Sequence, residues 1–141
     1  APPGLGEPVF DKLEADIGKA LLSIGAVKGV EFGRGFNLTK DRGSQSNDQM
    51  NDKGFVTNRA GGVIGVISSG EDIIVRVAVK PIPSISKEQK TVDVNGVERT
   101  ISVKGRHDPC AIPRINPVCE AMVLITILDH FLIQRAIGGV R

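Results

Sequence analysis

Asp72-Ile73-Ile74-Val75-Arg76-Val77-Ala78-Val79-Lys80 decides the fold, because apolar and polar side chains alternate along it. Successive residues of a strand point to opposite faces, so the branched side chains at positions 73, 75, 77 and 79 would share one buried face. Arg76 and Lys80 would lie on the other face. Pro81 and Pro83 follow directly, and prolines lack the donor that sheet pairing needs. The stretch therefore predicts a strand that is buried on one face and ends at Lys80.

The segments on either side of this strand suit a bound ligand. A lysine at the end of a strand, followed by a loop that ends in Ser84, is a suitable place to hold an anion. Upstream, the run Ala60–Gly70 contains glycines at positions 61, 62 and 65. Glycines let another backbone or a flat ligand approach closely. The sequence thus indicates a candidate anion site after the strand.

Two helices and a second strand are predicted to accompany this strand. An amphipathic helix is expected from Val9 to Ile24, with apolar residues at helical spacing and acidic residues near its start. A strand over Val27–Phe32 follows. The apolar segment Val118–Ala136 is expected to form a buried central helix, with Asn116-Pro117 at its start and Gly138-Gly139 after its end. Two helices packed on antiparallel strands place the chain in the α+β class.

The remaining segments are predicted to form loops and an exposed arm. Residues 37–54 and 85–91 are polar, so we expect mobile loops there. Asn95-Gly96, flanked by valines, is typical of a two-residue hairpin turn. We therefore expect a β-arm over Thr91–Val103, within a single domain that spans residues 1–141.

The composition argues against several classes of protein. The net charge is only +2 and no basic run alternates with aromatic residues, so no nucleic-acid partner is expected. The longest apolar stretch, Val118–Ile133, is interrupted by two acids and a histidine, so we expect no membrane span. Cys110 and Cys119 are too few for a disulfide framework, which favours reduced thiols in a cytoplasmic protein.

Gly105-Arg106-His107-Asp108-Pro109-Cys110 sets a cation, an imidazole, a carboxylate and a thiol close together. Arg106 offers a fork of donors that suits a phosphate or carboxylate. In an extended segment Asp108 points the same way as Arg106, and a carboxylate beside a guanidinium stays ionised. A surface turn with an ion pair is the alternative interpretation of this hexapeptide.

Other chemistry-bearing residues have plainer explanations. Zinc binding by the two cysteines and two histidines fails on spacing, so no metal site is expected. A Cys110–His107 nucleophile pair is geometrically allowed, but a thiol followed by apolar residues is more often buried. His130, on an apolar helix, is expected to be a hydrogen-bonded core or interface residue. Gly4-Leu5-Gly6 lacks a preceding strand and a third glycine, which argues against a dinucleotide-binding turn.

Five segments together resemble chorismate synthase. In the family's order they are Gly4–Leu13, Ala26–Gly33, Asn58–Gly70, Lys80–Ser84 and Lys104–Cys110. The resemblance covers nearly the whole chain but only the C-terminal part of the family. We therefore expect a fragment that lacks the family's catalytic histidines and most of its substrate-binding arginines. The lack of an initiator Met agrees with this expectation.

The resemblance implies a fold, a reaction and a cofactor. The family fold is a β–α–β sandwich with central helices packed on antiparallel strands, and the family works as a homotetramer. Its reaction is the anti-1,4-elimination of phosphate from 5-enolpyruvylshikimate 3-phosphate, which gives chorismate in the shikimate pathway of aromatic amino-acid biosynthesis. The reaction uses reduced FMN, with NADPH as a candidate reductant for the flavin.

The resemblance also assigns roles to residues. Asp108 matches the family aspartate thought to assist proton transfer. The residues placed around the flavin are Gly25, Ala26, Gly65, Lys80, Pro81, Ile82, Pro83, Ser84 and Arg106. Asn58, in the glycine run, is a further candidate. The alternative function is a catalytically silent fragment or interaction module that retains a phosphate-binding surface at Lys80 and Arg106.

Overall fold

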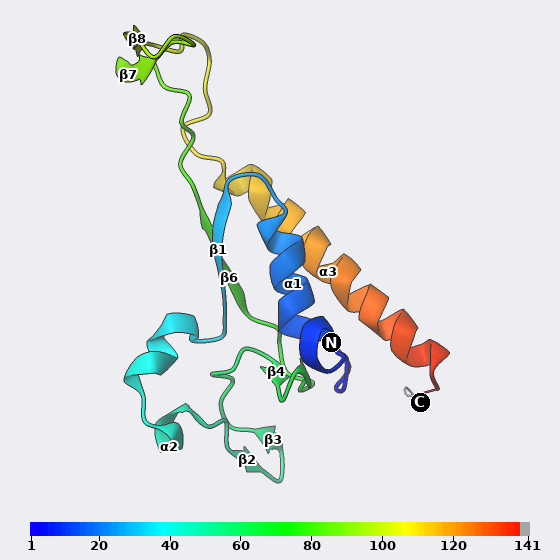
Figure 1. Cartoon of the computed structure of the whole chain (residues 1–141). Coiled ribbons are helices and arrows are strands. Elements are labelled where there is room, and N and C mark those ends of the chain that lie inside the picture. Colours follow the sequence, from blue (N-terminus) through cyan, green and yellow to red (C-terminus); the bar gives the residue numbers. More distant parts are fainter. Residues whose placement is uncertain (139–141) are drawn as a thin grey trace.

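Helices α1 (Leu13–Leu22) and α3 (Ile112–Ala136) lie against an antiparallel pair of strands, β1 (Val27–Phe32) and β6 (Val75–Val79). The computed structural model describes residues 1–138. Helix α1 contacts both β1 and α3, and Figure 1 shows it between the strand pair and α3. This arrangement confirms the α+β prediction of helices packed on antiparallel strands.

The core is built from one face of α1 and the alternating side chains of β6. Ile17 and its helical neighbours Leu13 and Leu21 are fully buried. Val75 and Val77 pack against this cluster. The alternation predicted for this strand is therefore confirmed, although regular pairing begins at Val75 and ends at Val79. The bounds predicted for the strand over Val27–Phe32 are also confirmed.

The outer face of the strand pair is held by a polar contact. Glu31 and Arg76 are directly paired across β1 and β6, and Arg76 Nε donates to Glu31 Oε1 at 2.7 Å. The backbone N–H of Phe36 donates to Glu31 Oε2 at 3.0 Å. The Phe36 hydrogen bond and then that of Arg76 hold the pKa of Glu31 below its ordinary value. The charged faces of the two strands thus pair with each other, away from the core.

The helix predicted from Val9 to Ile24 is interrupted. A 3₁₀ turn, η1 (Val9–Asp11), precedes α1, and Lys12 between them is extended, with ψ 144°. The cause is tertiary, because the Leu13 N–H donates to the carbonyl oxygen of Val66 at 3.1 Å. A residue in the middle of a helix would instead bond to the preceding turn. The single-helix prediction is therefore wrong at its first turn.

Helix α3 begins earlier than predicted. It starts at Ile112 rather than near Asn116, and Pro117 lies inside it. The Ala111 carbonyl accepts hydrogen bonds from the N–H groups of Arg114 and Ile115, both at 3.0 Å. A proline also occupies the first turn, where a missing N–H costs nothing. The early start brings Arg114 into the first helical turn. Gly139 lies outside the described residues.

The prediction that α3 is a buried central helix is wrong for this chain. Of its residues only His130 is buried, and Leu124 is 64% exposed. The other exposed large apolar residues of α3 are Ile112, Val118, Ile125, Leu128, Leu132 and Ile133. No element within residues 1–138 covers them, and Ile125, Leu128, Leu132 and Ile133 line an open groove beside α1. The apolar character on most sides of the helix was correctly recognised, but its burial depends on a surface outside this fold.

Helix α3 is long and apolar enough to cross a membrane by length and composition alone, whereas the sequence predicts no spanning segment. Its most apolar window has a mean hydropathy of 1.5 and is 6% buried. One side of the helix nevertheless packs on the protein core through Cys119, Met122, Val123 and Ile127. This packing favours a helix that contacts protein.

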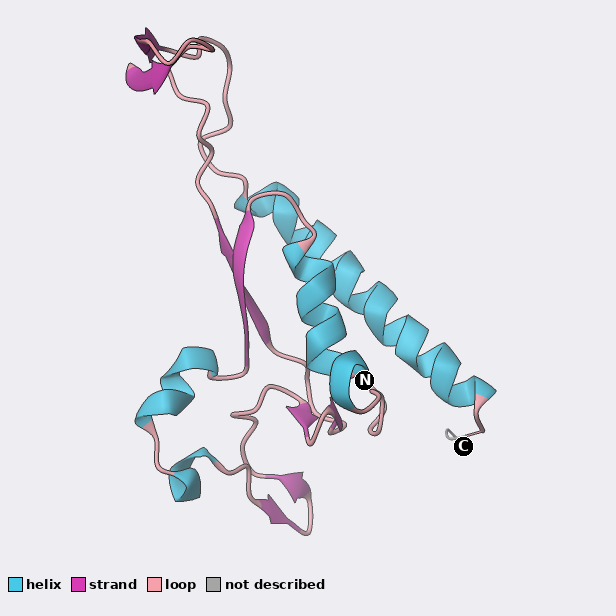
Figure 2. Cartoon of the chain, viewed as in Figure 1, coloured by secondary structure: helices cyan, strands magenta, loops and turns pink. Residues whose placement is uncertain are grey.

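Short elements fill the segment expected to be a mobile loop over 37–54. They are η2 (Gly35–Lys40), α2 (Gly43–Ser46) and strands β2 (Met50–Asn51) and β3 (Gly54–Phe55), which pair with each other. Figure 2 shows these elements as small pieces joined by loops. The segment is thus locally ordered in part, and its mobility remains a prediction.

Asp48 fastens this segment to the chain that follows it. Its Oδ1 accepts hydrogen bonds from Thr57 Oγ1 at 2.6 Å and from the Arg59 N–H at 2.7 Å. Its Oδ2 accepts from the Ala60 N–H at 2.9 Å. Burial raises the pKa of Asp48, but these hydrogen bonds outweigh it and hold the pKa below its ordinary value. The polar segment therefore relies on one carboxylate rather than on apolar anchors.

We expect Asp48→Asn to lower the free energy of unfolding at pH 7 by about 1–3 kcal/mol, because an amide donor would face the Ala60 N–H. Because the pKa of Asp48 is lower in the folded state, its carboxylate stabilises the fold at pH values above the unfolded-state pKa of about 3.9. This stabilisation is lost as the pH falls through the folded-state pKa. The difference between Asp48→Asn and the unmodified chain should therefore shrink below about pH 4. Urea unfolding across this pH range measures it. Asp52→Asn, at an exposed neighbour, is the control, and equal effects of the two variants would contradict the anchor.

A small hairpin closes the end of the fold that lies away from the arm. Strands β4 (Val63–Ile64) and β5 (Ile67–Ser68) are joined by Gly65 and Val66, which both have positive φ, at 60° and 75°. The Ser68 hydroxyl accepts from the Leu5 N–H at 2.9 Å and donates to the Pro2 carbonyl at 2.6 Å. The hairpin thus ties the N-terminal residues to the core.

The predicted β-arm is confirmed, but its turn differs. Strands β7 (Gln89–Val92) and β8 (Glu98–Ile101) pair far from the helices (Figure 1). The Asp93 N–H donates to the Val97 carbonyl, so three residues, not two, form the loop, with Gly96 at φ 78°. Asp93 Oδ1 accepts from the N–H groups of Asn95 and Val97 and so fixes this wider turn. The loop expected over 85–91 is also shorter, because β7 begins at Gln89.

Candidate functional site

The candidate site is a groove at the base of the arm, where β6 ends and α3 begins. Its volume is about 560 Å³. Its lining residues are Val79, Lys80, Pro81, Ile82, Ser84, Ile85, Ser86, Gly105, His107, Asp108, Pro109, Cys110, Ala111 and Ile112. The groove thus joins two segments that the sequence singled out separately, the loop after β6 and the hexapeptide that ends at Cys110.

The start of β1 fixes Lys80 at this groove. The Lys80 N–H donates to the Ala26 carbonyl at 2.7 Å, which extends the contact between β6 and β1 by one residue. Ala26 has φ 71°, an uncommon value for a residue with a side chain. Gly25 is the preceding residue, and it is not closely packed, because a Cβ there would meet no atom within 4 Å. Ala26 therefore lies beside Lys80, although neither Gly25 nor Ala26 belongs to the lining of the groove, and their flavin contacts remain predictions.

Asp108 lies on the rim of the groove and pairs with a residue that the sequence did not suggest. Its Oδ2 lies 3.1 Å from Nη1 of Arg114, in the first turn of α3. The expected guanidinium neighbour was Arg106. A helix predicted to start at Ile112 would have placed Arg114 in its first turn, near Asp108. The predicted start at Asn116-Pro117 instead left Arg114 in the preceding loop.

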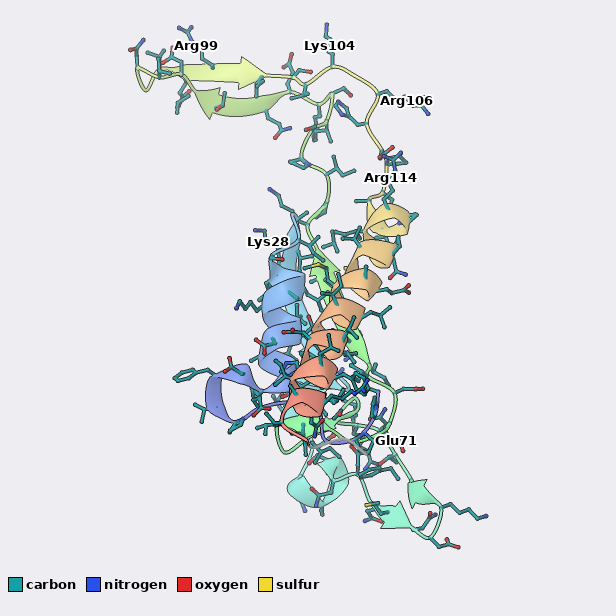
Figure 3. All side chains as sticks on the ribbon, turned by 90° about the vertical axis from the view of Figure 1, so that its right-hand side faces the viewer. Lys28, Glu71, Arg99, Lys104, Arg106 and Arg114 are labelled. Atoms are coloured by element: carbon teal, nitrogen blue, oxygen red, sulfur yellow. The ribbon has the colours of Figure 1, made fainter. Side chains whose placement is uncertain are left out.

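Arg106 does not line the groove. The returning leg of the arm is the segment 102–111, between β8 and α3. Figure 3 shows Arg106 on this leg, with its side chain directed outward, while Arg114 lies below it at the start of α3. Pro83 is likewise absent from the lining, although its neighbours Ile82 and Ser84 belong to it. The roles of Arg106 and Pro83 at a flavin remain predictions.

Hydrogen bonds between the two legs of the arm shape the groove. The Val103 N–H donates to the Ile85 carbonyl at 3.2 Å, and Ser102 Oγ donates to the Ser86 carbonyl at 2.7 Å. His107 Nε2 lies 3.2 Å from the Val103 carbonyl, a contact that requires its hydrogen on Nε2. His107 therefore braces the leg that carries Asp108.

Gly65 and Asn58 lie apart from the groove. Gly65 belongs to the β4–β5 turn, and Figure 1 shows this hairpin at the opposite end of β6 from Lys80. Asn58 donates from Nδ2 to the Asp72 carbonyl at 2.8 Å and accepts the Gly62 N–H at 2.7 Å. Within this chain Asn58 thus holds the glycine run in place, and a flavin contact of Gly65 remains a prediction.

The glycine run serves close backbone packing. A Cβ at Gly61 would lie 2.3 Å from the Gly33 nitrogen, and one at Gly62 would lie 2.4 Å from the Asp72 carbonyl oxygen. Of the two readings that the sequence left open at these positions, a close backbone and a flat ligand, the structure provides the backbone.

The remaining candidates are structural or exposed. His130 is 4% exposed and its Nε2 lies 3.0 Å from Oδ2 of Asp16, which confirms a hydrogen-bonded residue at the α1–α3 interface. Cys110 is exposed, so the expectation of a buried thiol is wrong. Over residues 1–138, no three histidine, cysteine or acidic side chains come together as a metal site would require.

The groove combines groups that suit an anionic, partly flat ligand. Lys80 supplies a cation and Ser84 a hydroxyl, while the Pro81 ring and the side chains of Ile82 and Ile85 supply apolar surface. Its volume lies in the range of about 300–1,000 Å³ that is typical of small-molecule sites. Asp108 adds a carboxylate that can accept a proton at the rim. Binding of a phosphorylated ligand beside a base is therefore chemically feasible here.

Comparison with known proteins gives one consistent family. A family model described as "Chorismate synthase" matches residues 1–132. The chorismate synthase of Desulfosudis oleivorans is 61% identical over 140 residues, which cover 99% of this chain and 40% of that protein. The chorismate synthase of Maridesulfovibrio salexigens is 57% identical, with 97% of this chain and 39% of that protein covered.

A solved structure gives the same result. The protein titled "Crystal Structure of Chorismate Synthase" superposes with a TM-score of 0.72 and 34% sequence identity. The match covers 94% of this chain and 34% of that chain. The chain described here therefore spans about 40% of the length of the curated relatives that it matches.

Proposed function

The chain belongs to the chorismate synthase family, and on this premise we propose that the groove at the base of the arm is part of a chorismate synthase active site. The reaction is the elimination of phosphate from 5-enolpyruvylshikimate 3-phosphate to give chorismate. The observation that carries the proposal is the meeting of Lys80 and Asp108, a cation and a carboxylate from distant segments, at one groove. Both belong to segments on which the family resemblance rests.

The residues at the groove fit reduced FMN. Lys80 and Ser84 would hold an anionic group of the flavin, and Pro81 and Ile82 would lie against its ring, with Gly25 and Ala26 nearby. When bound, reduced FMN supplies an electron-rich ring beside the substrate, and NADPH is the proposed reductant for that flavin. Gly65, Pro83 and Arg106 complete the proposed cofactor set, although they lie outside the groove in this chain.

Asp108 is proposed to move the proton that leaves the substrate. Elimination of phosphate requires loss of a proton as well, so the site needs a base close to the bound ligand. The side chain of Asp108 is partly accessible from the groove and carries one charge-assisted contact, to Arg114. A carboxylate in that setting can accept a proton while Lys80 offsets the negative charge of the phosphorylated ligand.

We propose a homotetrameric, cytoplasmic enzyme as the setting of this site. The apolar outer face of α3 supports further protein contacts, because so much exposed apolar surface is unusual for an isolated soluble domain. The relatives are named as synthases that form a small molecule, chorismate, which supports a cytoplasmic location.

A catalytically silent chain is the second candidate function. The short coverage of the relatives supports it, since residues from the rest of those proteins would be needed for turnover. In this case the groove at the base of the arm would bind a phosphate without reaction.

FMN titration of the purified chain, followed by fluorescence or calorimetry under anaerobic conditions, tests the proposal. We expect saturable binding of reduced FMN that strengthens with 5-enolpyruvylshikimate 3-phosphate. Lys80→Ala should weaken it about 10- to 150-fold, the equivalent of a lost charged hydrogen bond of about 1.5–3 kcal/mol. Lys90→Ala, on the exposed strand β7, is the control and should bind like the unmodified chain. No saturable binding would assign the isolated chain to the silent alternative.

Turnover is tested in a chimera in which this chain replaces the matching part of Desulfosudis oleivorans chorismate synthase. We expect chorismate formation from 5-enolpyruvylshikimate 3-phosphate with reduced FMN. An inactive but folded chimera would contradict the proposed function.

A further inference from the structure

We infer that Arg114 is the positioning residue for Asp108, an inference that rests on the function proposed above. Nη1 of Arg114 lies 3.1 Å from Oδ2 of Asp108. Among the described residues this is the only ion pair that involves a groove-lining side chain. Its role would be to hold the carboxylate in the orientation that proton transfer requires.

The two partners differ in the rigidity of their backbone. Arg114 belongs to the first turn of α3, a helix of 25 residues that packs on α1. Asp108 lies in the returning leg of the arm, which has no regular structure between β8 and α3. A side chain on an irregular segment needs a fixed partner to keep a defined orientation. Arg114 provides that partner from a helix that packs on the core.

The exposure of the pair argues against a mainly stabilising role. The Arg114 side chain is 79% exposed and that of Asp108 is 43% exposed. Ion pairs this open to solvent contribute little to the free energy of folding. Loss of Arg114 should therefore change the orientation of one carboxylate while the fold remains intact.

The contact also leaves the second carboxylate oxygen available. Arg114 contacts Oδ2, and within residues 1–138 no side chain or backbone group donates to Oδ1. Oδ1 can therefore accept a proton while Oδ2 stays paired. Arg106, whose side chain is directed outward in Figure 3, does not provide this contact.

Steady-state kinetics of the chimera test the role in turnover. We expect Arg114→Gln to lower kcat about 10- to 100-fold, as misplacement of a catalytic group by about 1 Å can do, while KM changes less than about threefold. Arg114→Lys, which keeps the charge, should recover most of the loss. In the Asp108→Asn background, Arg114→Gln should cause no further loss, because the two residues act through one contact.

Arg99→Gln is the matched control. Arg99 also forms an exposed pair with an aspartate at 3.1 Å, Asp93, but at the tip of the arm. Its removal should leave kcat unchanged. Equal kcat for Arg114→Gln and Arg99→Gln would overturn the inference, as would a further loss in the Asp108→Asn background. Inactivity of the unmodified chimera would instead contradict the proposed function.

A second measurement needs no turnover. Three-bond NMR couplings of Asp108 in the 141-residue chain report whether its side chain occupies one rotamer. We expect a single rotamer in the unmodified chain and in Arg114→Lys, and averaging over rotamers in Arg114→Gln. Averaged couplings in the unmodified chain would overturn the inference even if the chimera were active.

Discussion

Replacement of Asp108 by Asn in the chimera should lower kcat about 10²- to 10⁴-fold, the usual contribution of a general base. Asparagine has nearly the shape of aspartate, so the groove should keep its form. It cannot take up the proton that leaves the substrate. The affinity for reduced FMN should change less than about threefold, because binding relies on Lys80 and the apolar lining.

The measurement is kcat under anaerobic conditions, together with an FMN titration of the same variant. Glu88→Gln is the control, since Glu88 is an exposed acid on the other leg of the arm. Normal turnover by Asp108→Asn would remove Asp108 from the reaction. A parallel loss of flavin affinity would assign it to cofactor binding instead.

Replacement of Ile17 by Ala should destabilise the chain by about 2–5 kcal/mol, the usual cost of truncating a buried isoleucine. Ile17 is fully buried in the cluster where α1, β6 and α3 meet. Removal of its outer carbons leaves a cavity that the strand pair and two helices cannot all move to fill.

Urea unfolding followed by circular dichroism measures this loss as a lower midpoint with an unchanged slope. Leu22→Ala is the matched control, because Leu22 lies on the same helix and is 54% exposed. It should cost less than about 1 kcal/mol. A similar loss in both variants would show that the α1 face carrying Ile17 is not the centre of the core.

Local patterns were sufficient for the elements that pack on their own neighbours. The alternation of residues 73–79 predicted β6, and the strand predicted over Val27–Phe32 was found with the same bounds as β1. In β6 the buried face is set by side chains two positions apart, whereas a β-bulge between Val27 and Gly29 shifts that spacing in β1.

The features that the sequence did not predict depend on contacts between distant segments. The turn at Lys12 follows from a hydrogen bond to Val66, and the pairing of Asp108 depends on where α3 begins. Burial of α3 cannot be predicted from its own sequence. The apolar residues of a helix show which surface could be buried, but not whether a partner is present to cover it. At the arm, Asp93 selected a wider turn than the Asn95-Gly96 pair alone would suggest.

The order in which the core residues occur along the chain has a consequence for synthesis. Arg76 meets Glu31 across 45 positions, and His130 meets Asp16 across 114. Such distant contacts require closure of long loops, which slows folding. Because α3 follows α1, β1 and β6 along the chain and supplies Met122, Val123 and Ile127 to the core, the cluster around Ile17 is complete only after α3 has been synthesised. Until then the part of the α1 surface that these side chains cover is open to water and to chaperones.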